Sequence, residues 1–65
     1  MEPRDELIAR ALADIIPLLR EASARLEHDV PLTLGLNRQT LLSFHDEIER
    51  LAVRADGTLR TLNQA

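Results

Sequence analysis

Two long apolar stripes, repeating at alternating steps of four and three residues, constrain this chain more than any other feature. The first stripe consists of Ile8, Leu12, Ile15, Leu19, Ala22 and Leu26. The second consists of Leu41, His45, Ile48, Ala52, Ala55, Leu59 and Leu62. This spacing is that of one face of an α-helix. It therefore predicts an all-α protein with two amphipathic helices.

The breakpoints of the pattern divide the chain into a helix over residues 3–28, an apolar connection over 29–36, a helix over 37–62 and a tail over 63–65. Pro3 suits a first helical turn, and Asn37 is a favoured residue for capping a helix start. Pro17 interrupts the first helix, but the stripe keeps its phase on both sides of it. We therefore expect one bent helix there, with Pro17 on the outer face, in a single domain covering residues 1–65.

Both stripes are wider than the contact between two helices requires, because further apolar residues flank them. A chain of 65 residues without cysteine has no disulfide to support so small a core. The sequence thus predicts an antiparallel helical hairpin that dimerises into a four-helix bundle, with a partner helix from another protein as the alternative. The residues expected at the dimer interface are Ile8, Leu12, Ile15, Leu19, Leu26, Leu41, Phe44, Ile48, Leu51 and Leu59.

The connection is apolar where connections are normally polar, since it contains Leu32, Leu34 and Leu36. These leucines either close the end of the helix pair or form a contact surface. We predict that they bind a larger protein partner.

His45 occupies a position within the second stripe and is the one candidate for a pH-sensitive residue, because its ordinary pKa lies near 6.5. His45 and Glu49 are spaced as metal ligands can be on a helix. No second ligand cluster accompanies them in the sequence, so we expect no metal site. Ser23 and Ser43 belong to no recognisable catalytic set, and a glycine-rich phosphate loop is missing from the sequence. We expect neither an enzyme nor a bound cofactor.

The charge pattern argues against nucleic acid and membrane partners. The net charge is −3, whereas binding to phosphate backbones needs a basic patch. The acidic N-terminus lacks the apolar region of a signal peptide, and no apolar run approaches the ~20 residues of a membrane span. The expectation is a cytoplasmic protein.

The segment Leu34-Gly35-Leu36-Asn37-Arg38-Gln39-Thr40-Leu41 resembles the turn and the start of the recognition helix in helix-turn-helix DNA-binding domains, especially those of the Fis-like kind. This resemblance implies that residues 35–45 contact DNA. The stretch that follows is acidic where those domains are basic. Our principal hypothesis is therefore a non-enzymatic interaction module, of the adaptor, antiactivator or co-chaperone type, with a DNA-binding regulator as the alternative.

Overall fold

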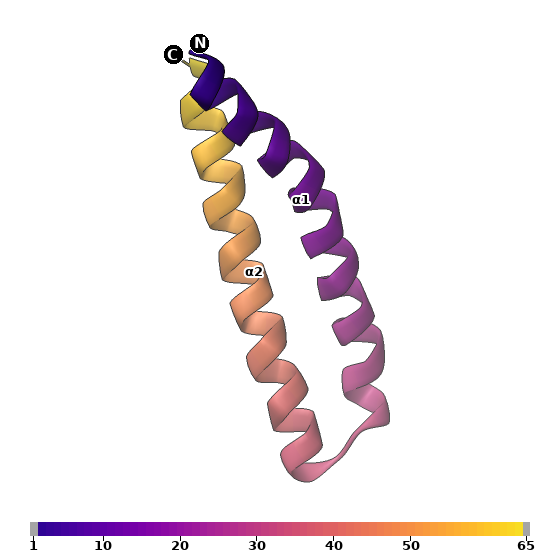
Figure 1. Ribbon diagram of the computed structural model, residues 1–65. Helices are drawn as coiled ribbons and strands as arrows, with labels where there is room; N and C mark the ends of the chain where they lie inside the picture. Colours follow the sequence, from indigo (N-terminus) through magenta and orange to yellow (C-terminus); the bar gives the residue numbers. More distant parts are fainter. Residues whose placement is uncertain (1, 65) are drawn as a thin grey trace.

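The computed structural model describes residues 2–64 as two antiparallel helices joined by a short turn (Figure 1). Helix α1 spans Pro3–Asp29, the 3-10 helix η1 spans Val30–Leu32, and helix α2 spans Gly35–Gln64. The predicted all-helical hairpin is confirmed. The ends of the predicted domain, residues 1 and 65, lie outside the described residues.

Helix α1 is continuous through Pro17, whose side chain is exposed on the outer face. A proline inside a helix removes one backbone hydrogen bond, and an exposed position lets the freed carbonyl reach water. Pro3 stands in the first turn, where a missing N–H costs nothing, and Asp5 and Glu6 place negative charge at the positive end of the helix dipole. The first helix therefore follows directly from its own sequence.

The connection is more helical than its composition predicts. Helix η1 follows α1 without a break, and both the backbone N–H and the hydroxyl of Thr33 donate to the carbonyl of Val30, at 3.1 and 2.9 Å. Gly35 then adopts a φ of 60°, which favours glycine, and begins α2. The predicted helix start at Asn37 is thus wrong by two residues, because the turn at Gly35 brings the chain into the helix earlier.

Helix α2 continues through Gly57 and on to Gln64, two residues past the predicted end. Residues 63 and 64 of the predicted tail are therefore helical, and residue 65 lies outside the described residues. Leu59 and Leu62 remain in phase with the rest of the helix and are half-buried, which extends the contact with α1 beyond the glycine.

The two helices contact each other along one seam, and its register in α1 differs from the prediction. On α2 the buried and half-buried positions include those of the predicted stripe. On α1 the seam contains Leu12, Leu19 and Leu26 as predicted, but Ile16 and Ser23 are buried in place of Ile15 and Ala22. The seam is therefore rotated away from Ile8 and Ile15, which are both exposed.

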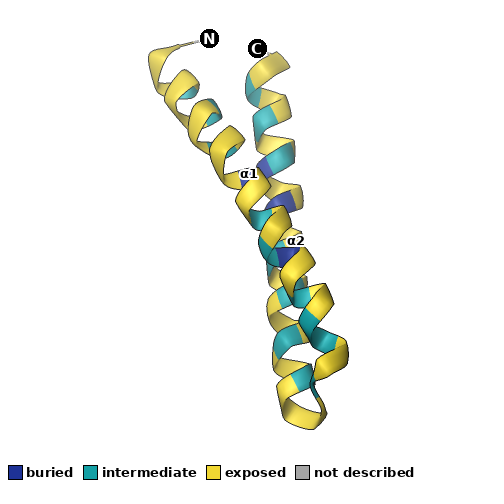
Figure 2. Cartoon of the chain, turned by 90° about the vertical axis from the view of Figure 1, so that its right-hand side faces the viewer, coloured by how far each residue is buried: buried dark blue, intermediate teal, exposed yellow. Residues whose placement is uncertain are grey.

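The core formed in this way is very small (Figure 2). Among residues 2–64, the buried residues are Ile16, Ala52, Ala55 and Ser23, each 6–8% exposed. The Cα trace measures 48 × 14 × 14 Å, the dimensions of a rod. Neither of the two described helices carries an apolar window long enough to cross a bilayer.

The two glycines give a matched test of this fold. A Cβ added at Gly57 meets no atom within 4 Å, so G57A should raise the free energy of unfolding by about 1 kcal/mol through helix propensity. G35A should lower it by about 1–2 kcal/mol, because alanine is strained at the positive φ of that residue. Urea unfolding followed by circular dichroism measures both. Stabilisation by G35A, or destabilisation by G57A, would contradict the described turn and the continuity of α2.

Candidate functional site

The structure divides the residues predicted at the dimer interface into two sets. Six of them lie in the seam between α1 and α2 and are half-buried by the hairpin itself: Leu12, Leu19, Leu26, Leu41, Ile48 and Leu59. The other four remain exposed by 43–54%: Ile8, Ile15, Phe44 and Leu51. Only the second set is free to contact another molecule.

The exposed set lies on one side of the hairpin. Ile8 and Ile15 immediately precede the seam residues Ala9 and Ile16, and Phe44 and Leu51 immediately precede His45 and Ala52. One residue corresponds to a rotation of about 100° around a helix axis. Because α1 and α2 are antiparallel, the same rotation on both helices leads to the same face.

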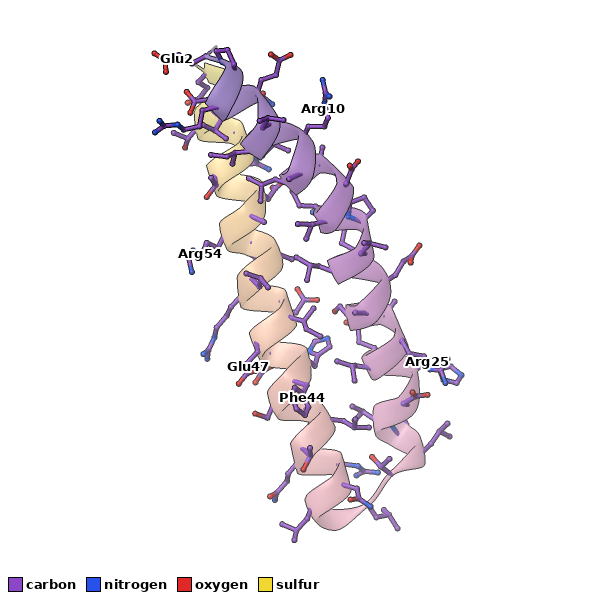
Figure 3. The ribbon with its side chains drawn as sticks, in the orientation of Figure 1. Glu2, Arg10, Arg25, Phe44, Glu47 and Arg54 are labelled. Carbon is purple, nitrogen blue, oxygen red and sulfur yellow. The ribbon has the colours of Figure 1, made fainter. Side chains whose placement is uncertain are left out.

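We call this surface the apolar face. Helical spacing adds Ala11, Leu18 and Ala22 of α1 to it, which are exposed or half-buried. Its members are Ile8, Ala11, Ile15, Leu18 and Ala22 from α1 and Phe44 and Leu51 from α2. In Figure 3, Phe44 is drawn in front of the α2 ribbon, while Arg10 and Arg25 point away from α2 and Glu47 and Arg54 point away from α1. On α2 the same one-residue offset also gives Glu47 and Arg54, which border Leu51, so the apolar character of this face comes mainly from α1, Phe44 and Leu51.

The opposite side of the hairpin is polar. A groove of about 510 Å³ runs between the helices there, lined by six charged or hydroxyl side chains and by smaller apolar ones. The charged and hydroxyl residues are Arg20, Ser23, Glu27, Glu49, Asp56 and Arg60. Asp56 and Arg60 form an ion pair at 3.0 Å within α2. The two sides of the hairpin therefore differ, since one carries most of the large exposed apolar side chains of α1 and the other carries the polar groove.

Four side chains beside this groove form a cluster that joins the two helices. The Ser23 hydroxyl of α1 donates a hydrogen bond to the Glu49 carboxylate of α2. Nε2 of His45 lies 3.0 Å from Oε1 of Glu27 in α1 and 3.8 Å from Oε1 of Glu49. Two carboxylates from different helices thus converge on one imidazole.

The cluster favours the charged form of His45. Its side chain is 20% exposed, and the hydrogen bond to Glu27 raises the pKa of His45 above its usual value. Burial opposes this shift, while the negative charges of Glu27 and Glu49 and a contact of Nδ1 with Asp46 at 3.8 Å add to it. Protonated His45 can donate to Glu27, and this contact is lost when the imidazole becomes neutral and Nε2 carries no proton.

The three leucines of the connection do not close the end of the helix pair. Leu32, Leu34 and Leu36 are 73–80% exposed, the highest values among the large apolar residues. Val30, which is half-buried, is the apolar residue of the connection that packs against the helices. The leucines therefore form an uncovered apolar tip where the chain turns.

The segment that resembles a recognition helix lies at the start of α2, beside the connection. Gln39 and Thr40 are exposed, and the Thr40 hydroxyl donates to the carbonyl of Leu36 at 2.9 Å. Arg38 lies on the seam side and is half-buried, with its Nε shielded from solvent. The helix before the turn is antiparallel to α2, whereas helix-turn-helix motifs cross at roughly 90–120°.

Sequence reasoning missed Glu27 and Ser23 as partners of His45 and Glu49. A stripe centred on Ile8, Ile15 and Ala22 leaves Glu27 outside the predicted contact between the helices. A seam through Leu12, Ile16, Leu19, Ser23 and Leu26 repeats with the same alternation of four and three. This second set of heptad positions is the sequence signal that predicts Ser23 on the side of α1 facing α2.

Comparisons with protein-family models, with characterised proteins and with solved structures give no match to this chain.

The cluster predicts a pH dependence of stability. The pKa of His45 is higher in the folded state than its unfolded value of about 6.5. His45 therefore contributes its full stabilisation below pH 6.5, and this stabilisation is lost as the pH rises through the pKa of the folded state. The melting temperature should therefore fall between pH 6 and pH 8.5, and H45Q should remove most of that fall. H28Q, which replaces an exposed histidine bonded to Asp29 at 3.0 Å, is the control and should keep the decline. A decline of equal size in H45Q would contradict this role of the cluster.

Proposed function

We propose that this chain is a non-enzymatic protein–protein interaction module that works in the cytoplasm as a homodimer, through the apolar face, and regulates a larger protein. The observation that carries the proposal is the sidedness of the hairpin. Large apolar side chains from both helices share one face, while six charged or hydroxyl side chains line the groove on the other. A helix that keeps exposed apolar side chains next to its contact with one helix can pack against a second helix as well, as in a four-helix bundle.

The surface area of the hairpin supports an interface of ordinary size. The chain exposes 5174 Å², whereas a compact monomeric protein of 7.3 kDa exposes about 4,200 Å². The excess of roughly 1,000 Å² is close to the ~800 Å² that each partner contributes to a standard interface. Covering the apolar face with one other molecule would bring the exposed area to the value expected for a folded protein.

The composition of the apolar face favours a second copy of this chain. In α1 the positions on this face from Ile8 to Ala22 carry no ionisable side chain. The α1 parts of two identical faces can therefore meet without bringing like charges together, while Glu47 and Arg54 border Leu51 on the α2 part. A two-fold axis through the centre of the face places the same surface against itself, which is how most homodimers form. Ala11 and Ala22 are small enough to let helices approach closely.

The connection supplies the surface that we assign to the regulated protein. Leu32, Leu34 and Leu36 lie at the turn end of the rod, whereas the apolar face runs along its side. A dimer formed through that face would leave the leucines uncovered. A shallow apolar pocket on the larger protein would provide the complementary surface.

A charge placed on the apolar face tests the dimer. I15E and L51E should each convert the protein to a monomer, because a carboxylate would be buried there without a partner. Size-exclusion chromatography with light scattering at micromolar concentration measures the mass. V53E adds the same charge at a 70% exposed residue that lines the groove on the opposite side, so it should remain dimeric. If I15E and L51E kept the mass of the unmodified protein, the apolar face would not be the interface.

Substitutions at the tip test the second surface separately. L32S combined with L34S should leave the helical content and the dimer mass unchanged, since both side chains contact water in the hairpin. A partner protein is first recovered with the tagged unmodified chain and identified by mass spectrometry. The double variant, tagged in the same way, should no longer recover it. Equal recovery of that partner by both proteins would exclude the tip as its binding surface.

A further inference from the structure

The cluster on the polar face contains the elements of a metal site that joins the two helices. Oxygen or nitrogen ligand atoms of Glu27, His45 and Glu49 all lie within 4.8 Å of one another. We propose that these three side chains bind a divalent transition-metal ion of the zinc class. The proposal does not depend on the dimer, because the cluster lies on the face opposite to the proposed interface.

The imidazole distinguishes this cluster from a group of surface carboxylates. His45 lies at a seam position with 20% of its side chain exposed, so the packing of the two helices limits its movement. Its Nε2 atom is directed at both carboxylates, at 3.0 Å from Glu27 and 3.8 Å from Glu49. Small side-chain rotations would let one ion replace the direct contacts, with ligands at about 2.0–2.2 Å.

A supporting contact holds one of the ligands in place. Ser23 is buried in the seam, 6% exposed, and its hydroxyl bonds the Glu49 carboxylate. Hydrogen bonds of this kind orient metal ligands, and their removal typically weakens metal binding about 10–100-fold. Ser23 occupies a position where an apolar residue would pack better, and orienting Glu49 gives this polar residue a role.

The charges of the groove also favour a cation. In the part of the chain that the structure describes, Glu27 and Glu49 form ion pairs with His45 alone. Arg60, which lines the same groove, is paired with Asp56. Arg20 also lines the groove, but no ion pair joins it to either carboxylate among residues 2–64. With His45 neutral, neither carboxylate would have a partner in an ion pair. A divalent ion would neutralise both.

The ligand set points to the class of metal. One imidazole nitrogen and two carboxylate oxygens suit Zn²⁺ or a similar first-row ion, whereas Mg²⁺ and Ca²⁺ prefer all-oxygen sites. Three protein ligands leave a fourth position of a tetrahedral ion for water. Glu27 belongs to α1 and both other ligands to α2, so the ion would cross-link the two helices in the half of the hairpin nearer the turn.

Titration of the full chain with ZnCl₂ at pH 7.5 tests the site. Isothermal titration calorimetry should give one ion per chain, and two-dimensional NMR should show the imidazole signals of His45 changing with the same midpoint. The melting temperature should rise with Zn²⁺, because the ion binds the folded chain and links its helices. MgCl₂ at the same concentrations should produce neither change.

Three variants identify the ligands. E27Q should weaken Zn²⁺ binding by more than about tenfold; Glu27 is 63% exposed, so this change leaves the fold intact. H45Q should abolish saturable binding, and circular dichroism checks that its helices persist. H28Q should bind within twofold of the unmodified chain, because the control histidine lies outside the cluster. The proposal is overturned if Zn²⁺ does not saturate, if it perturbs only His28, or if E27Q binds as tightly as the unmodified chain.

Discussion

Two helices that contact only each other leave most of each helix in water, and the rest of this structure depends on that constraint. The seam between α1 and α2 buries just four residues among residues 2–64, and each of them keeps 6–8% of its surface exposed. Ile15, Leu18 and Phe44 stay exposed beside it, on a face that both helices share. Hydrophobic burial is the main favourable term in folding, so a rod with this distribution would gain stability by covering that face.

The helices could be predicted from sequence because each depends on residues close together in the chain. The face of α1 that contacts α2 could not be predicted, because two sets of heptad positions coexist in α1 and share Leu12, Leu19 and Leu26. One phase adds Ile8 and Ile15, and the other adds Ile16 and Ser23. Hydrophobicity alone favours the first phase, yet the hairpin uses the second. The more apolar phase is left facing outward, which is consistent with a helix that packs against two neighbours.

The polar cluster was beyond sequence reasoning for a related reason. Glu27 and His45 are 18 residues apart, and they meet because the turn through η1 and Gly35 sets how far α2 runs back along α1. A shift of one turn would separate them by about 5.4 Å. Polar residues buried at a helix interface often specify register. In our proposal, the apolar face serves association, and the polar cluster holds the two helices in one alignment.

The most direct test of this account is the mass of the unmodified chain in solution. Sedimentation equilibrium at micromolar concentration should give about 14.6 kDa, twice the 7.3 kDa of one chain. The melting temperature should also rise with protein concentration, as expected when folding and association are coupled. A species of 7.3 kDa that melts cooperatively at a temperature independent of concentration would contradict the account, because a single hairpin would then be stable with its apolar face in water.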